Sequence, residues 1–87
     1  MTPQDRIRLG TLIGTPHPEL FTPDTDSGDN GLLAQWLLSA GWSIHISLYS
    51  GGIYHCTLGR TSGDDDISAE APSRREALAL CALGLCE

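Results

Sequence analysis

Two histidines have the spacing that a metal site between neighbouring strands would need. His45 lies in one segment of alternating apolar and polar residues, and His55 lies in the next. Diagonal positions on paired strands set Cβ atoms roughly 7–8 Å apart, a span that a metal ion could bridge. A zinc site needs three or four ligands, however, and we expect no Cys, Asp or Glu beside the histidines on that face. The sequence therefore predicts two polar surface histidines and no metal site.

The cysteines offer a second kind of chemistry, that of a thiol nucleophile. His55 and Cys56 are neighbours, but adjacent side chains of a strand point to opposite faces, so the imidazole could not activate this thiol. Cys81 and Cys86 are five residues apart in a predicted helix, on sides that a disulfide cannot join. We therefore predict buried structural thiols, no cofactor and no enzymatic activity.

Negative charge is the more informative feature. The chain has 11 acidic residues and 5 basic ones, all arginine, for a net charge of −6. Two groups of aspartates stand out, which are Asp24, Asp26 and Asp29 in the first and Asp64, Asp65 and Asp66 in the second. Such a surface repels nucleic acid and speeds association with basic protein surfaces. We therefore predict a protein partner with a basic surface and no direct binding to nucleic acid.

Two paired strands must position the histidines. Residues 42–49 alternate strictly, and a second strand is expected from 53 to about 59. A three-residue loop over 50–52 keeps the apolar side chains on one face, whereas a two-residue loop would mix the faces. The predicted pairs are Ile44–Leu58, Ile46–Cys56 and Leu48–Tyr54. We predict the longer loop, with Gly52 in the left-handed position after a type I turn, and Tyr49 on the polar face with both histidines.

Residues 1–29 read as a short helix followed by an irregular acidic arm. Thr2 before a proline is typical of an N-cap with a first-turn proline, so a helix is predicted over 3–13. The arm after it carries prolines, a glycine and acids without apolar periodicity. We expect Leu20 and Phe21 to hold the arm against the core.

Residues 30–87 read as a domain of helix, three strands and helix. Asn30 is the predicted N-cap of the first helix, and Ser73 that of a last helix over 74 to about 86. A short third strand is expected over 67–71. The last helix is apolar almost all round, so it needs cover on more than one side, from the N-terminal segment or another molecule. The predicted fold class is α+β, a three-stranded antiparallel sheet with helices packed on it.

Length and hydropathy limit the classes of protein. A chain of 87 residues is too short for a dinucleotide-binding fold or a barrel enzyme, which need roughly 200 residues or more. No apolar run reaches the ~18 residues of a membrane helix and no signal-peptide pattern follows Met1, so we expect a cytoplasmic protein without a membrane partner. A single hydrophobic core of this size gives only marginal stability, which favours a homodimer through the sheet edge or the last helix.

Four stretches between Phe21 and Cys86 carry a family resemblance. They are Phe21-Thr22-Pro23-Asp24, Ala40-Gly41-Trp42, Gly51-Gly52 followed by Tyr54-x-Cys56, and Ala69-Glu70-Ala71 leading into Ala77-Leu78-Ala79-Leu80-Cys81-Ala82-Leu83. In these stretches the chain resembles the phage ABA-sandwich domain family, small proteins encoded by bacteriophages. Several small acidic phage proteins inhibit bacterial immunity, including CRISPR–Cas complexes. The resemblance therefore implies an inhibitor of a host defence complex, acting in the cytoplasm of the bacterial host.

The residues expected to bind this partner follow from charge and residue type. The six aspartates of the two acidic groups are the expected contacts, the run over 64–66 first and those of the arm second. Tyr49 on the polar sheet face is the expected aromatic anchor, because interface hot spots favour tyrosine. Together these residues would cover a basic nucleic-acid-binding or recruitment site on the partner.

Two other functions stay open. Ser73-Arg74-Arg75-Glu76-Ala77 is similar to the Ser-Lys-Lys-x-Ala at the start of the last helix in the double-stranded-RNA-binding domain, which has the same order of elements. That resemblance implies RNA binding through Arg74, Arg75 and His55. However, the position of the third basic residue in the family pattern is occupied here by Leu78, and the net charge of −6 opposes RNA binding. A phage structural or assembly protein is the other alternative.

Overall fold

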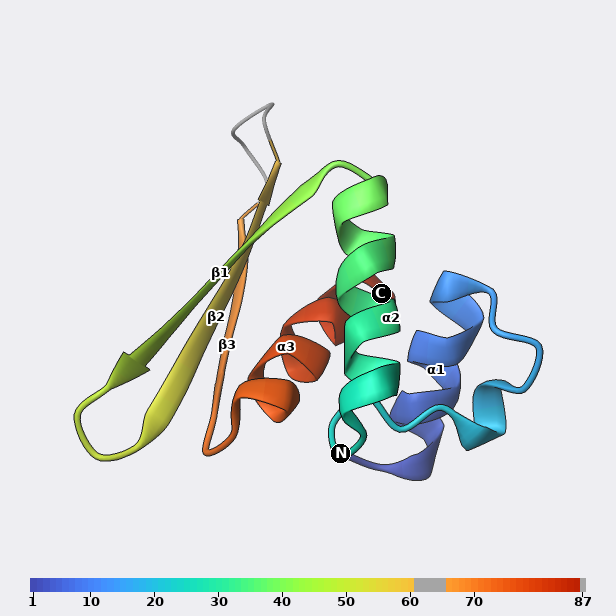
Figure 1. Ribbon diagram of the computed structural model, residues 1–87, viewed down its shortest axis with the longest axis horizontal. Coiled ribbons are helices and arrows are strands. Elements are labelled where there is room, and N and C mark those ends of the chain that lie inside the picture. The colour runs from blue at the N-terminus through green and yellow to red at the C-terminus, as the bar shows by residue number, and fades with distance from the viewer. Residues whose placement is uncertain (61–65, 87) are drawn as a thin grey trace.

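A three-stranded antiparallel sheet organises the fold. In the computed structural model, which describes residues 1–60 and 66–86, the strands lie in the order β1–β2–β3. The strands are β1 (Trp42–Tyr49), β2 (Ile53–Arg60) and β3 (Ile67–Ala71). The helices α1 (Pro3–Ile13), α2 (Ser27–Ser39) and α3 (Arg74–Leu83) lie on one side of the sheet (Figure 1), with short 3₁₀ turns over Pro18–Leu20 and Gly84–Cys86. The predicted α+β class and the order of its elements are confirmed.

The hairpin of β1 and β2 has the predicted register. Its pairs include Ile44–Leu58, Ile46–Cys56 and Leu48–Tyr54. The loop has the predicted length, and Gly52 has a positive φ of 78°. The predicted turn type is wrong, because Gly51 has a φ of 92° at the third position of a turn closed by the Gly52 amide and the Tyr49 carbonyl, 3.3 Å apart. A positive φ at that position belongs to a type II turn, which glycine adopts at no steric cost.

Two predicted helix starts are confirmed. Thr2 caps α1, where its Oγ1 accepts from the Asp5 amide and its own amide donates to the Asp5 carboxylate, each at 3.2 Å. Ser73 caps α3, where its Oγ accepts from the Glu76 amide at 3.2 Å. Each cap satisfies an amide that has no partner within its own helix.

The predicted start of α2 at Asn30 is wrong. The helix begins earlier in the chain, with Asp26 as its N-cap. Asn30 lies within the helix, and its side-chain Nδ2 donates to the carbonyls of Pro23 at 2.9 Å and Arg75 at 3.2 Å. Asn30 therefore joins the arm to α3 instead of beginning the helix.

One hydrophobic core fills the space between the sheet and the helices. Leu9 of α1 is 0% exposed and Phe21 of the arm 3% exposed, so the N-terminal segment contributes to this core. Phe21 holds the arm as predicted, whereas the prediction for Leu20 is wrong, because Leu20 is 69% exposed. α3 contacts the sheet, α2 and α1, so its predicted cover by the N-terminal segment is confirmed. The predicted boundary between 1–29 and 30–87 falls inside α2.

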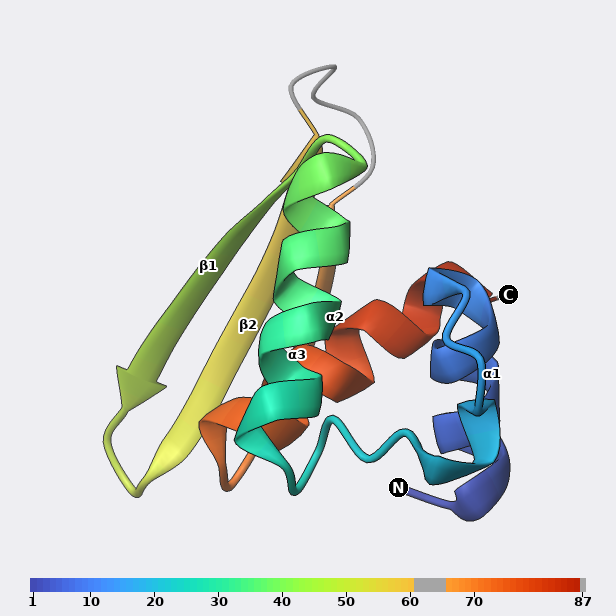
Figure 2. The same cartoon turned by 45° about the vertical axis from the view of Figure 1, so that its right-hand side comes forward.

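The sheet has an inner face against the helices and an outer face on the opposite side. Figures 1 and 2 both show the helices on the inner side. Side chains alternate along each strand, so the outer face consists of the residues that alternate with the core. These are Ser43, His45, Ser47, Tyr49, Ile53, His55, Thr57, Ser68 and Glu70. None of the described helices has both the length and the apolar character needed to cross a membrane.

Candidate functional site

Tyr49 and His55 form an aromatic pair on the outer face. Tyr49 pairs with Ile53 and His55 with Ser47, so the two rings are diagonal neighbours, and Glu70 of β3 flanks His55 on its other side. The rings stack with their centroids 5.4 Å apart and their planes 13° from parallel, and Tyr49 Oη lies 3.5 Å from His55 Nδ1. Tyr49 is nevertheless 50% exposed. The stack therefore fixes the orientation of a tyrosine ring that stays accessible.

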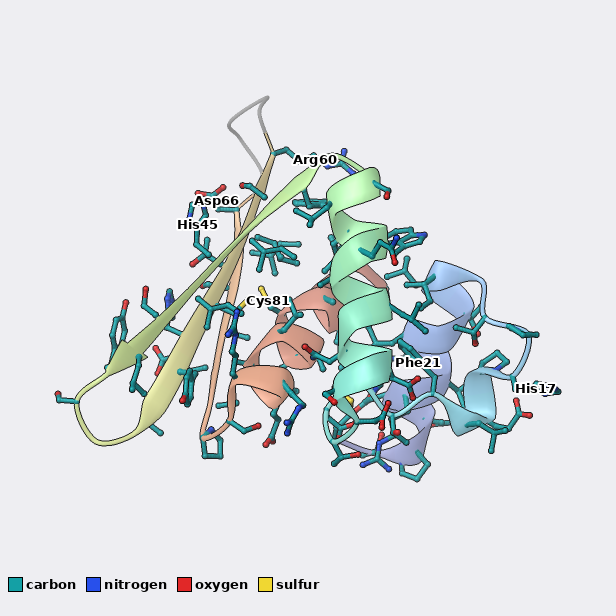
Figure 3. The ribbon with its side chains drawn as sticks, viewed as in Figure 1. His17, Phe21, His45, Arg60, Asp66 and Cys81 are labelled. Atoms are coloured by element: carbon teal, nitrogen blue, oxygen red, sulfur yellow. The ribbon has the colours of Figure 1, made fainter. Side chains whose placement is uncertain are left out.

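The described part of the predicted acidic run also reaches the outer face. Asp66 is exposed, and its Oδ1 lies 3.0 Å from the position that a Cβ on Gly59 would occupy. Figure 3 shows Asp66 and His45 on the side of the sheet away from the helices. Asp64 and Asp65 lie outside the described residues.

Asp24, a predicted partner contact, is tied to α1. Arg6 donates from Nε to Oδ1 at 3.0 Å and from Nη2 to Oδ2 at 2.9 Å, the two-pronged geometry of a guanidinium with a carboxylate. The Asp24 side chain is 7% exposed. The hydrogen bonds from Arg6 hold the pKa of the Asp24 carboxyl below its usual range. A partner could engage Asp24 only by displacing Arg6, and no local pattern marks a pair that is 18 residues apart in sequence.

Asp26 and Asp29, also predicted contacts, order the arm at the start of α2. Asp26 Oδ2 accepts from the Asp29 amide at 2.8 Å. Asp29 Oδ2 accepts from the amide and the hydroxyl of Thr22, at 2.9 and 3.3 Å. These carboxylates satisfy backbone amides at the helix start and in the arm. An aspartate followed three positions later by another acid is a known helix-start signal, which the prediction of Asn30 overlooks.

The buried thiols have a structural role. Cys56 and Cys81 are both 0% exposed, and Cys81 Sγ donates to the carbonyls of Cys56 at 3.5 Å and Ile67 at 3.1 Å. A side-chain hydrogen bond between the Cys56 and Cys81 thiols, together with burial, raises the pKa of the Cys56 thiol far above its ordinary value. Cys56 therefore stays a neutral thiol, and it points to the inner face while His55 points to the outer one, as predicted.

The two histidines lie where the sequence places them. His45 pairs with Thr57 and His55 with Ser47, so the histidines are diagonal neighbours on the outer face. Across residues 1–60 and 66–86, no group of three His, Cys, Asp or Glu side chains is placed to hold a metal ion. The histidines instead contribute ring surface and hydrogen-bonding nitrogens to the outer face.

Arg74 and Arg75 lie on the other side of the sheet from His55. They line a groove of about 740 Å³ between α2, the first turn of α3 and inner-face residues such as Ile46 and Tyr54. The three residues that the RNA-binding alternative requires therefore lie on two sides of the sheet.

Comparison of the chain with protein-family models, with curated proteins and with solved structures gives no match. The resemblance to the phage ABA-sandwich family accordingly stays a prediction. The candidate site is therefore the outer face of the sheet, with the acidic residues Asp66 and Glu70 on it.

Proposed function

We propose that this protein acts by binding another protein through the outer face of its sheet. The observation that carries the proposal is the Tyr49–His55 stack, which orients an exposed tyrosine ring on the outer face of the sheet. Tyrosine offers a large contact area at a low cost in conformational entropy, and it is enriched among the residues that dominate binding energy. Ile53, paired with Tyr49, adds apolar surface beside the stack.

The charge around the stack supports a partner with a basic surface. Asp66 and Glu70 lie on the outer face, while Arg74 and Arg75 line the groove on the inner side. The chain as a whole carries a net charge of −6. Charge of opposite sign on the partner would steer it toward this face and fix its orientation, which raises the association rate more than the final affinity.

The resemblance to small phage proteins supplies the class of partner. We infer that the partner is a bacterial defence complex with a basic nucleic-acid-binding site, such as a CRISPR effector complex. Occupying that site would exclude the nucleic acid, so inhibition needs no chemical step. The proposed function is therefore that of a non-enzymatic inhibitor that works by occlusion.

A panel of purified CRISPR effector complexes, with duplex RNA as a comparison ligand, tests this proposal. For an effector that binds, Tyr49→Ala should weaken the affinity about 30-fold or more, because truncating a hot-spot residue costs at least ~2 kcal/mol. Asp66→Asn combined with Glu70→Gln should slow association, and more so at low salt. Biolayer interferometry at low and moderate salt measures both effects.

Leu32→Ala is the matched control for Tyr49→Ala. Leu32 is 52% exposed on α2 and Tyr49 is 50% exposed on the outer face, so both truncations remove similarly accessible side chains. Leu32→Ala should bind like the unchanged chain. Equal affinities of the two variants would exclude the outer face as the binding surface. Binding to duplex RNA that Arg74→Ala/Arg75→Ala abolishes, with no effector bound, would replace the proposal by the RNA-binding alternative.

A further inference from the structure

β1 is an edge strand that the described residues, 1–60 and 66–86, leave uncovered. Its eight residues pair with β2 on one side only, and Figure 2 shows β1 outermost, with no helix beyond it. Its sequence, WSIHISLY, contains no Asp, Glu, Lys, Arg or Pro, and its pairing with β2 runs without a bulge. Free strand edges pair readily with other strands, and proteins usually block them with charges, prolines or bulges. β1 has none of these devices.

The opposite edge of the sheet is protected. β3 has five residues, includes Glu70 and begins directly after Asp66. A short strand with a charged side chain offers few backbone groups and repels another acidic chain. Because the chain blocks one edge and leaves the other open, we expect β1 to be paired in solution.

Exposed apolar surface adjoins the open edge. Leu48 near the end of β1 is 61% exposed, and Leu38 of α2 is 59% exposed. Leu38 also lines the groove of about 740 Å³, together with Ile44 and Ile46 of β1. A strand added beside β1 would therefore cover both an unpaired backbone edge and an apolar strip along it.

We propose that a second copy of this chain covers this edge, through antiparallel pairing of β1 with β1 into one continuous sheet. The lack of charged residues in β1 allows this occupant. Each copy carries a net charge of −6, and β1 is a place where two copies can meet without setting a carboxylate opposite a carboxylate. A strand of the same sequence also brings an identical row of apolar side chains, which extends the inner face. This inference does not depend on the proposed function.

The alternation of β1 limits the register of the pair. Two registers pair most of the strand and keep the apolar side chains of both copies on the inner face. In the first, Ile46 lies opposite Ile46 of the second copy, and in the second, His45 lies opposite His45 of the second copy. The first register places Leu48 opposite Ile44 of the second copy and so covers the exposed leucine. The second sets two imidazoles directly opposite each other, which repel when protonated. The geometry therefore points to the register centred on Ile46.

The pairing closes at a dimer. Both copies contribute the same strand, so the interface is symmetric, and once two copies have paired neither has a free β1 edge for a third. The edges left at the two ends of the joined sheet are both β3, short and charged. Since a two-fold axis through Ile46 stands perpendicular to the sheet, the outer faces of both copies lie on the same side of the dimer.

Sedimentation velocity over about 1–500 µM of the full chain tests the inference, because association by mass action depends on concentration. We expect a monomer–dimer equilibrium, with a dissociation constant that Leu48→Lys raises about 10-fold or more by placing a charge in the pair. Leu20→Lys is the matched control, since Leu20 is 69% exposed and Leu48 61% exposed. The control should dimerise like the unchanged chain.

Hydrogen exchange on the unchanged chain provides a second test that needs no variant. Amides of β1 should exchange more slowly as the concentration rises, whereas amides of β3 should keep their rates. A chain that stays monomeric throughout, a dimer that Leu48→Lys leaves intact, assemblies larger than a dimer, or protection that rises at β3 instead would each overturn the inference. Target binding by Tyr49→Ala is measured separately, so failure here leaves the proposed function standing.

Discussion

The arm and the outer face carry polar side chains of similar kinds, and the fold uses them in opposite ways. In the arm and the first turn of α2, the carboxylates of Asp24, Asp26 and Asp29 all accept hydrogen bonds from within the chain. On the outer face, Tyr49 and Glu70 are exposed, and the Tyr49–His55 contact orients the tyrosine without burying it. Charge in the arm therefore contributes to folding, while the side chains of the outer face stay available to a partner.

Backbone hydrogen bonding explains the difference. The strands hydrogen-bond to one another through β2, so few of the outer side chains are needed as partners for the backbone. Residues 21–26 of the arm form no helix or strand, and the backbone amide of Thr22 donates to the Asp29 carboxylate. Burying an amide without a partner is costly, so the arm needs its aspartates as acceptors. The following changes test this contrast through the free energy of unfolding.

Phe21→Ala should give the largest loss of stability. Phe21 is 3% exposed and is the arm's aromatic contribution to the core. Removing a buried phenylalanine typically costs about 3–5 kcal/mol, which for so small a domain is a large part of the total. Urea unfolding followed by circular dichroism measures the change. Leu20→Ala, next in sequence but 69% exposed, should change stability by less than about 0.5 kcal/mol; equal losses would mean that the arm does not pack as described.

Gly10→Ala should give the next largest loss, because it separates the arm from α1. A Cβ on Gly10 would lie 2.7 Å from Pro18 Cα, closer than packed atoms can approach. Relieving this overlap by moving the backbone costs about 1–3 kcal/mol. Gly31→Ala is the matched control in α2, where a Cβ meets nothing within 4 Å and the change should stabilise the chain by up to ~1 kcal/mol. A stabilising Gly10→Ala would show that this contact is loose.

Features that depend on neighbouring residues could be predicted from the sequence. Alternation over 42–49 and 53–59 determines the faces of the hairpin, and a one-residue slip would move Ile46 to the outer face. Thr2 and Ser73 have local capping signals. The position of Tyr49 on the outer face follows from the same alternation, so this part of the candidate site was predictable.

Features that depend on distant contacts could not be predicted in this way. Leu20 and Phe21 are equally apolar candidates, and their burial depends on how the 3₁₀ turn directs each side chain. Asp24 looks like free surface charge until the fold brings Arg6 to it. Counting acidic residues therefore overstates the charge available to a partner, because composition does not show which carboxylates already have one.

Asp24→Asn should lower stability by a smaller amount that depends on pH. Arg6 lowers the pKa of folded Asp24 below its ordinary 3.8, so the unfolded chain binds more protons between the two values. The stabilisation is complete above the unfolded pKa and is lost as the pH falls through the folded one. At neutral pH we expect a loss of about 1–2 kcal/mol, limited by the partial exposure of Arg6.

Urea unfolding at neutral pH and at about pH 3 or below measures this dependence, because protonation removes the paired carboxylate. The gap in stability between Asp24→Asn and the unchanged chain should shrink in acid. Asp66→Asn, which removes an exposed carboxylate before β3, should leave stability nearly unchanged at neutral pH. A gap for Asp24→Asn that stays constant with pH would show that the ion pair with Arg6 does not form in solution.

Tyr49→Ala should give the smallest loss, about 0.5–1 kcal/mol, because an exposed cross-strand pair contributes little to folding. A double-mutant cycle with His55→Ala, each variant unfolded in urea, isolates the coupling between the two rings, expected near ~0.5 kcal/mol. A loss above about 2 kcal/mol would place the stack among the structural elements of the fold, as the arm's aspartates are. With a small loss, any large drop in partner affinity for Tyr49→Ala must come from the missing contact, because the domain that presents it would still be folded.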